Sequence, residues 1–260
     1  MPTLHVVVPF YEESGTLDAC LRRVLAADIP TGWGLDVTLV NDGSSPAASE
    51  AARAICTSNV VRFLEHDRNR GKGAAIRTGF RSVLERAADD DVIIIQDADL
   101  EYDPADYPGL LDAIVTGRAA AVFGNRWGHA PEDRFQRRVH RLMNQALTAA
   151  SNALSGLHVH DMECCYKLFR TPVLRRIMPF LTEDRFGIEP QIAAALGRLR
   201  IPVAEAAVRY APRSFAEGKK IRAKDGVRAL WVIARERFRA APRERTVTAE
   251  AEGRQAEPGA

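Results

Sequence analysis

Short apolar segments alternate with segments in which apolar residues recur at helical spacing through the first 125 residues. Residues 4–9 and 92–95 are nearly continuous apolar runs of the kind that form buried parallel strands. The pattern predicts strands at 4–9, 37–40, 60–64, 92–95 and 120–123, and helices at 15–27, 46–57, 74–87 and 110–115. This alternation predicts βαβ units, and therefore an α/β fold with a parallel sheet flanked by helices.

Polar side chains follow directly after several of the predicted strands. Asp42 follows the second strand, residues 68–72 follow the third, and Asp97 and Asp99 follow the fourth. In an open α/β sheet, ligands bind at the edge formed by the carboxyl ends of the strands. We therefore expect residues 1–110 to bind a nucleotide, with their carboxylates gathered at one edge of the sheet.

The second half of the chain has a different composition. Apolar residues recur at helical spacing over 135–150 among several arginines, and a helix over 190–199 precedes a strand over 201–208. Residues 219–239 hold eight Lys/Arg against Asp225 and Glu236, and an apolar stripe runs through them. Beyond residue 240, Val247 is the only large aliphatic residue, so we expect a disordered tail over 241–260.

Composition excludes several classes of protein. The 260 residues are 46% hydrophobic, enough for a sizeable core, and no apolar run reaches the roughly 18 to 20 residues of a membrane span. The first ten residues have neither the basic region nor the cleavage site of a signal peptide. Four cysteines without a CxxC pair favour reduced cytosolic thiols over a zinc site or a disulfide framework.

Charge is divided unevenly behind a formal net charge of +2. Residues 1–110 carry 10 Lys/Arg against 18 Asp/Glu, whereas residues 111–260 carry 26 against 16. The basic segments at 134–150 and 219–239 are either solvated faces or helices that lie on an anionic membrane surface. Nucleic acid is not expected as a partner, because aromatic residues make up only 7%, no recognised binding motif occurs and the front half is acidic.

The pair Asp97 and Asp99, at the end of a buried strand, is the sharpest chemical signal. Two carboxylates one residue apart can aim at one cation, and their hard oxygen atoms suit Mg²⁺ or Mn²⁺ carrying a diphosphate. Glu101 and Asp103 add acidity and favour a cation site over a solvated acidic turn. The Gly71-Lys72-Gly73 segment, at a predicted helix start, indicates either a generic anion cradle or a simple glycine turn.

The histidines carry weaker signals. His5 lies on a predicted buried strand, so we expect it to be a satisfied histidine of the core or its rim. His158 and His160 flank Val159 and have the spacing to share one face of a strand. Two ligands without a third do not predict a metal site there.

Several polar motifs occur in an order that resembles a known family. They lie at residues 8–13, 41–45, 69–75 and 96–104, and the match continues at 124–126, 161–169, 186–189, 210–213, 218–221 and 225–226. Together they resemble the family 2 glycosyltransferases of GT-A fold, in particular the dolichyl-phosphate mannose/glucose synthase branch. The resemblance covers about residues 4–240, and the order of the motifs makes it specific at the level of the family.

The resemblance implies both a fold and an activity. The fold is a Rossmann-like GT-A domain over 1–240 with a mostly parallel central sheet, in which residues 1–110 bind the nucleotide-sugar and residues 111–240 the acceptor. Basic amphipathic helices would lie at its C-terminal end. The activity is an inverting, metal-dependent transfer of a hexose from a UDP- or GDP-sugar to a polyprenyl phosphate, at the cytoplasmic face of the membrane.

Roles for single residues follow from the same resemblance. It places Asp97, Asp99 and Glu101 on Mg²⁺ or Mn²⁺, which would neutralise the leaving nucleoside diphosphate. The residues that it places on the donor are Pro9, Tyr11, Glu13, Asp42, Lys72, Asp97, Arg213 and Lys219. The acceptor phosphate is already an anion near neutral pH, so it needs cations more than a strong base. The catalytic candidates are Asp99, Arg126, Arg138 and Arg141, with Arg137 and His140 as alternatives for the phosphate contact.

Two positions depart from the family pattern, and two other functions stay open. Glu12 stands where the family often has Asn, and Gln191 stands where it often has a second acid. The same fold could glycosylate a soluble acceptor, since many relatives carry C-terminal membrane helices and this sequence has none. A non-catalytic protein that binds nucleotide-sugars is the other alternative, although the intact carboxylates oppose it.

Overall fold

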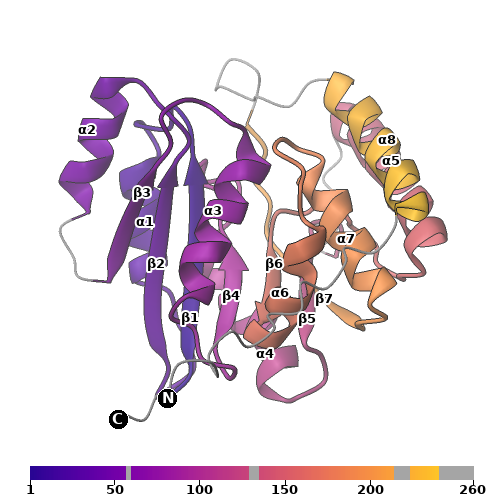
Figure 1. Ribbon diagram of the computed structural model, residues 1–260, viewed down its shortest axis with the longest axis horizontal. Helices are drawn as coiled ribbons and strands as arrows, with labels where there is room; N and C mark the ends of the chain where they lie inside the picture. Colours follow the sequence, from indigo (N-terminus) through magenta and orange to yellow (C-terminus); the bar gives the residue numbers. More distant parts are fainter. Residues whose placement is uncertain (57–59, 129–134, 214–222, 240–260) are drawn as a thin grey trace, which may run out of the picture.

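The computed structural model describes residues 1–56, 60–128, 135–213 and 223–239, and it describes the backbone alone for 135–140 and 223–225. A seven-stranded sheet with the strand order β3-β2-β1-β4-β6-β5-β7 forms the centre of the protein (Figure 1). Its strands are β1 (Thr3–Phe10), β2 (Gly34–Asn41), β3 (Val61–Glu65), β4 (Val92–Ile95), β5 (Ala121–Asn125), β6 (Lys167–Arg170) and β7 (Val203–Ala207).

The sheet is mostly parallel, as predicted. β1 pairs in parallel with β2 and β4, β2 with β3, and β5 with β7. β6 runs antiparallel to both of its neighbours, β4 and β5. The carboxyl ends of β1, β2 and β4 therefore meet at one edge of the sheet, and the polar segments that follow them share that edge.

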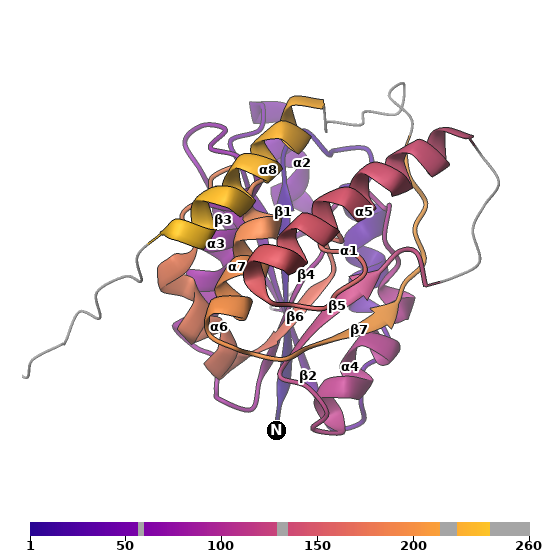
Figure 2. The same ribbon diagram turned by 90° about the vertical axis from the view of Figure 1, so that its right-hand side faces the viewer.

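Helices cover both faces of the sheet. α1 (Leu17–Leu25), the short η1 (Pro104–Asp106) and α4 (Tyr107–Val115) lie on one face, and α2 (Pro46–Ile55) packs against α1 (Figure 2). α3 (Lys72–Leu84) and α6 (Thr171–Ile177), which η2 (Met178–Phe180) continues, lie on the other face. α5 (Phe135–Ser155), α7 (Ile188–Arg198) and α8 (Ala223–Phe238) pack against one another beyond β6 (Figure 1).

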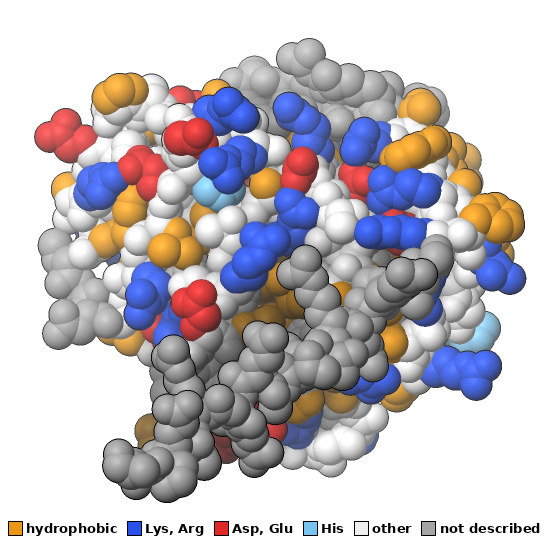
Figure 3. All heavy atoms as spheres, in the orientation of Figure 1, with side chains coloured by type: hydrophobic (Ala, Val, Ile, Leu, Met, Phe, Trp, Pro, Cys, Tyr) orange, Lys and Arg blue, Asp and Glu red, His pale blue; other side chains and the backbone are white. Residues whose placement is uncertain are grey.

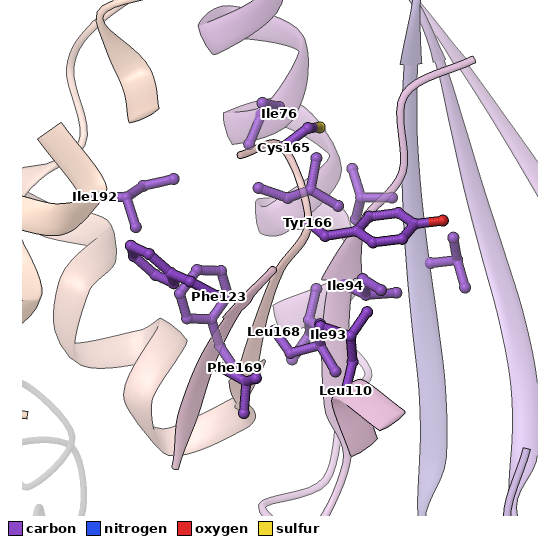
Figure 4. Close-up of a cluster of buried hydrophobic side chains, with 14 of the residues drawn as sticks. Ile76, Ile93, Ile94, Leu110, Phe123, Cys165, Tyr166, Leu168, Phe169 and Ile192 are labelled. Atoms are coloured by element: carbon purple, nitrogen blue, oxygen red, sulfur yellow. The ribbon is translucent and has the colours of Figure 1, made fainter. Parts of the chain in front are cut away.

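The core is centred on β4 and β6. Ile93, Ile94, Leu168 and Phe169 are fully buried where the two strands pair, and Tyr166 packs beside them (Figure 4). This explains the apolar run at 92–95, because a strand buried on both faces has no polar side to present. The core joins strands from both halves of the chain into one sheet.

His5 is a buried rim histidine, as predicted. Its side chain lies between Asp36 and Asp91, with Nδ1 2.8 Å from Asp36 Oδ2 and Nε2 3.1 Å from Asp91 Oδ2. The predicted reduced thiols agree with the structure, in which all four cysteines are free. Among the described residues, no helix is long and apolar enough to cross a membrane.

One interpretation of the second half of the chain was wrong, and one strand there was not predicted. Residues 158–160 form no strand, and His160 instead holds Glu205 through its backbone N–H and its Nδ1, at 2.7 and 2.6 Å. The strand in this region is β6, which the sequence pattern did not predict because it spans four residues and begins with Lys167. The predicted disordered tail at 241–260 lies outside the described residues.

Candidate active site

The end of β4 carries the carboxylates that the sequence singled out. Asp97, Asp99 and Glu101 lie on the loop that follows this strand, and Leu100 between them adopts a positive φ of 62°. That left-handed turn lets the Asp99 carboxylate accept the N–H of Glu101 at 3.1 Å. The loop thus places Asp99 and Glu101 close together at the carboxyl edge of the sheet.

Lys72, the first residue of α3, is paired with Asp97. Its Nζ lies 2.9 Å from Oδ1 and 3.0 Å from Oδ2 of Asp97, and 3.4 Å from Oε1 of Glu189. Burial opposes the charged form of Lys72, but Asp97, Cys165 and Glu189 outweigh it and raise the pKa well above its usual value. Lys72 is therefore a fixed cation that joins the end of β4 to α7.

Arg213 is the second cation of the site. Its Nη1 donates to Glu13 Oε2 at 3.0 Å and its Nη2 to Glu13 Oε1 at 3.2 Å. Nη2 also donates to Asp99 Oδ2 at 3.0 Å, and the backbone N–H of Arg213 donates to Glu101 Oε1 at 2.9 Å. The structure thus brings together four residues that the sequence analysis assigned to the donor or the metal.

Acidic groups are crowded around Asp99. Burial raises the pKa of this carboxyl to about 7, and the nearby charges of Asp97 and Glu101 add to the rise, although Arg213 opposes it. Carboxylate oxygens are the ligands that Mg²⁺ and Mn²⁺ prefer, and a divalent cation would relieve this repulsion. The chemistry of Asp97, Asp99 and Glu101 therefore fits the predicted metal.

The present arrangement nevertheless pairs these carboxylates with side-chain cations. In the described part of the chain, no three His, Cys, Asp or Glu side chains converge on one point as metal ligands do. Lys72 is paired with Asp97 and Arg213 with Asp99, so each cation occupies carboxylate oxygens that an ion would need.

Asp42, which the resemblance assigns to the donor, is bonded to the loop that precedes α3. Its carboxylate accepts the backbone N–H of Arg70 at 2.9 Å and that of Gly71 at 2.7 Å, and His66 Nδ1 lies 2.7 Å from it. Both oxygen atoms thus hold the loop before α3. The expected contact of Asp42 with a base or ribose stays a prediction. If Asp42 makes it, the same carboxylate both binds the nucleoside and holds the loop.

Residues 183–185 pack closely against the glycines at the start of α3, where the sequence indicated either an anion cradle or a glycine turn. A Cβ atom at Gly71 would overlap the backbone O of Asp184, and one at Gly73 would overlap the backbone O of Glu183. The N–H of Ala74 donates to Asp184 O at 3.0 Å. The N–H groups of Gly71 and Ala74 are therefore used by Asp42 and Asp184, and the anion cradle stays a prediction beside the simple glycine turn.

The first motif, after β1, is tied to the loop that follows β2. Pro9 is buried at the end of β1, Tyr11 is exposed, and Glu12 adopts a positive φ of 53°. The Glu12 carboxylate accepts the N–H and Oγ–H of Ser45 at 2.6 and 3.0 Å, at the N-terminus of α2. The acid that departs from the family pattern thus has a structural role, because it links the two loops.

Arg126 lies in a buried ion pair. The Nε and Nη2 of Arg126 each donate to the Asp161 carboxylate at 2.7 Å, and its backbone N–H donates to the same carboxylate at 3.0 Å. The Arg126 guanidinium also lies 5.0 Å from the ring of Tyr210. Arg141 lies on α5 with its guanidinium 5.5 Å from the ring of Trp127. Two donor groups of Arg126 are thus committed to Asp161, and its predicted contact with the acceptor phosphate remains a prediction.

Several predicted residues cannot be placed in this site. The side chains of Arg137, Arg138 and His140 lie outside the described residues, although the backbone there is the first part of α5. Lys219 also lies outside the described residues.

Sequence reasoning missed a buried charge network behind the site. Lys167 Nζ donates to Glu189 Oε2 at 2.6 Å and to Met162 O at 3.0 Å. Glu163 lies nearby, its Oε1 is buried without a hydrogen-bond partner, and burial together with Glu189 raises its pKa to about 7. Both acids stand in motifs that carried the resemblance, but only their three-dimensional proximity shows that they interact.

Comparison with known proteins identifies the family. Residues 5–178 match the model of glycosyl transferase family 2, and the chain belongs to this family. Curated relatives include undecaprenyl-phosphate 4-deoxy-4-formamido-L-arabinose transferases from Aeromonas hydrophila, 30% identical over 219 residues, and from Pseudomonas aeruginosa, 28% identical over 218 residues. The matches cover 83% of this chain and 62% and 60% of those relatives, so the chain spans about three fifths of their length.

Solved structures show the same fold. Glucosyl-3-phosphoglycerate synthase from Mycobacterium tuberculosis, in complex with Mn²⁺, UDP and phosphoglyceric acid, superposes with a TM-score of 0.64 at 17% identity, covering 92% of this chain and 80% of that one. The same enzyme with Mg²⁺ and UDP gives a TM-score of 0.63 at 19% identity, with 90% and 79% covered. The predicted glycosyltransferase fold of GT-A type is confirmed.

Proposed function

We propose that this protein transfers a sugar from a nucleotide-sugar to a polyprenyl phosphate. The observation that carries the proposal is the set of carboxylates at the end of β4, held at the ligand-binding edge of a family 2 fold by Lys72 and Arg213. The names of the relatives support the acceptor, because they state undecaprenyl phosphate. The same names state an arabinose derivative, so the transfer assay below includes a nucleotide-linked pentose as well as the hexoses that the resemblance implied.

The proposed metal is Mg²⁺ or Mn²⁺, held by Asp97, Asp99 and Glu101. Structural neighbours were solved with these ions and UDP, which supports a divalent cation and a nucleoside diphosphate. When bound, the ion would neutralise charge that develops on the leaving diphosphate. The configuration at the sugar carbon inverts if the acceptor phosphate attacks in a single displacement. Because that phosphate is already a nucleophilic anion, the protein's task is to position it.

The remaining roles belong to side chains of this chain. Pro9, Tyr11 and Glu13 lie after or at the end of β1, where a nucleoside can lie beside the loop that Asp42 organises. Positively charged side chains of the second half would hold the acceptor phosphate, since guanidinium groups bind phosphate through paired hydrogen bonds. The candidates for this contact remain Arg126, Arg138 and Arg141.

We also propose contact with an anionic membrane, on the cytoplasmic face, through α8. One face of this helix is buried at Ala229, Val232, Ile233 and Glu236, and it packs on α5 and α7. The opposite face is also apolar and open to solvent, at Val227, Leu230, Trp231 and Phe238. Figure 3 shows apolar and basic side chains gathered on the side of the molecule where α8 lies. An apolar stripe flanked by Arg228, Arg235 and Arg237 is typical of a helix at a lipid interface.

The transfer assay tests the proposal directly. The protein is incubated with labelled UDP- and GDP-sugars, undecaprenyl phosphate in detergent, and Mg²⁺ or Mn²⁺. We expect label to move into the organic phase with one nucleotide-sugar, and EDTA to abolish the transfer. Label that moves only to a water-soluble acceptor would support the soluble-acceptor function instead. Failure of every nucleotide-sugar both to donate and to raise the melting temperature would contradict the proposal.

A further inference from the structure

Arg213 lies where segments distant in sequence meet. Its guanidinium bonds to Glu13, which follows β1, and to Asp99, which follows β4, at distances of 3.0 to 3.2 Å. These contacts connect residues 200 and 114 positions apart in the chain. The Arg213 and Asp99 side chains are each 17% exposed, so water and salt screen this interaction less than they would at the surface.

Among the residues that the structure describes, the site holds more carboxylate than cation. Lys72 is taken up by Asp97, whereas the single guanidinium of Arg213 is shared by Glu13 and Asp99 and also lies 3.8 Å from Glu101. Within this described part of the site, one positive charge shared among three acidic groups leaves an excess of negative charge. A divalent cation would neutralise that excess.

Arg213 also stands where that cation would bind. Mg²⁺ ligands lie about 2.0 to 2.1 Å from the ion, so oxygens of different carboxylates must approach one point closely. Here Nη2 of Arg213 is bonded to Oδ2 of Asp99, and its Nε lies near Oε1 of Glu101. For the ion to bind both acids, the guanidinium must leave Asp99.

The side chain can leave without moving the backbone that carries it. The N–H of Ala211 donates to Glu101 O at 2.9 Å, and the hydroxyl of Tyr210 donates to Glu101 Oε2 at 3.0 Å, so this segment is anchored independently of the guanidinium. Nε of Arg213 is buried without a hydrogen-bond partner. The guanidinium is thus incompletely satisfied where it lies.

We propose that Arg213 is an exchangeable cation: it neutralises Asp99 while no divalent ion is bound, and the incoming ion displaces its guanidinium toward the donor diphosphate. The inference rests on the proposed function and deepens it. Released from Asp99, the guanidinium offers a planar pair of N–H groups to a phosphate. Metal and donor then bind with positive coupling, because the ion has to displace Arg213 and the diphosphate provides the guanidinium with a new partner.

The test separates metal binding from donor binding. Binding of Mn²⁺ alone is measured from the EPR signal of the free ion, for the wild type and for Arg213→Gln. Removing the competing cation is expected to tighten Mn²⁺ binding by about tenfold. With Mn²⁺ saturating, binding of UDP and GDP is measured by calorimetry, and the same variant is expected to bind the preferred nucleotide about tenfold more weakly.

Two further variants serve as controls. Arg213→Lys keeps a cation, so Mn²⁺ affinity should stay near that of the wild type. Arg209→Gln removes a neighbouring, exposed arginine that pairs with Asp106 at 2.8 Å, and neither affinity should change. Melting temperatures verify that all variants fold.

Each outcome decides the inference. Mn²⁺ binding by Arg213→Gln that is unchanged or weaker than in the wild type would overturn it, and so would tighter Mn²⁺ binding with unchanged nucleotide affinity. If the wild type and every variant bind neither Mn²⁺ nor nucleotide, the proposed function fails together with the inference. If all of them bind both ligands equally well, only the inference fails.

Discussion

The carboxylate of Asp42 accepts the backbone N–H of Gly71 at 2.7 Å, so the end of β2 determines the course of the loop that begins α3. The same carboxylate accepts the N–H of Arg70, and His66 lies against it. Lys72 follows directly and reaches Asp97 at the end of β4. Asp42 thereby connects the end of β2 to the end of β4 through the loop that precedes α3 and through Lys72.

Replacing Asp42 by Asn should destabilise this loop. The amide nitrogen that replaces one oxygen cannot accept the N–H of Arg70 or Gly71, and an unpaired buried donor costs about 1 to 3 kcal/mol. Urea denaturation should show a loss of that size, and nucleotide affinity should fall as well. The control is Asp67→Asn, which removes an exposed acid that pairs with Arg70 on the same loop. Equal losses for the two variants would contradict the role assigned to Asp42.

The space around two helical glycines, Gly73 in α3 and Gly109 in α4, predicts opposite effects of their substitution by Ala. Gly73→Ala should destabilise the protein, because its Cβ would overlap the backbone O of Glu183 and lie 2.9 Å from the backbone O of Arg185. Gly109→Ala, in α4, meets nothing within 4 Å and should stabilise the protein by about 0.5 to 1 kcal/mol. Thermal unfolding of both variants measures the contrast, and a stabilising Gly73→Ala would contradict the close contact with residues 183–185.

Glu163 should make stability depend on pH. Its pKa is raised from 4.5 to about 7 by burial and by Glu189 of α7, against Lys167 of β6 and Arg126 after β5. From about pH 4.5 to 7 the unfolded chain releases this proton while the folded protein retains it, so the folded state loses stability as the pH rises. Glu163→Gln should remove that loss and gain on the order of 1 to 3 kcal/mol relative to the wild type by pH 8.

Urea unfolding at several pH values measures the effect of Glu163→Gln. The control is Glu50→Gln, an exposed acid on α2, which should follow the pH profile of the wild type. A constant difference between Glu163→Gln and the wild type across this pH range would refute the assignment.

The exposed stripe of α8 should be required for membrane binding. Trp231 is 53% and Phe238 87% exposed, so replacing both with Ser should cost little stability. We expect the double variant to float far less with phosphatidylglycerol vesicles than the wild type, and high salt to weaken wild-type binding. Val115→Ser changes an exposed aliphatic residue on α4 and should float normally. Undiminished flotation of the double variant would eliminate α8 as the membrane contact.

The sequence predicted those parts of the fold and site whose determinants are local. β1, β2 and β4 are buried parallel strands, which appear as apolar runs, and Asp97 and Asp99 follow one of them directly. β6 escaped prediction because Lys167, which would interrupt an apolar pattern, is neutralised inside the core by Glu189. Such pairing depends on segments that come together only on folding.

The partners within the site show the same limit. Arg213 was assigned to the donor through a resemblance, but its bonds to Glu13 and Asp99 join segments that no local pattern relates. The resemblance assigned Asp42 to the donor but gave no sign of its bonds to the backbone N–H groups of Arg70 and Gly71, which any residue type could supply. Long-range and backbone-mediated contacts therefore emerged only from the structure.

The most direct test of the central claim is the transfer of labelled sugar to undecaprenyl phosphate by Asp99→Ala. The control is Asp90→Ala, an exposed acid near the opposite end of β4. Because a divalent ion stabilises a leaving diphosphate by several kcal/mol, losing its ligand should slow transfer by at least about a hundredfold. We predict this loss for Asp99→Ala and normal activity for Asp90→Ala. Undiminished transfer by Asp99→Ala would contradict the account.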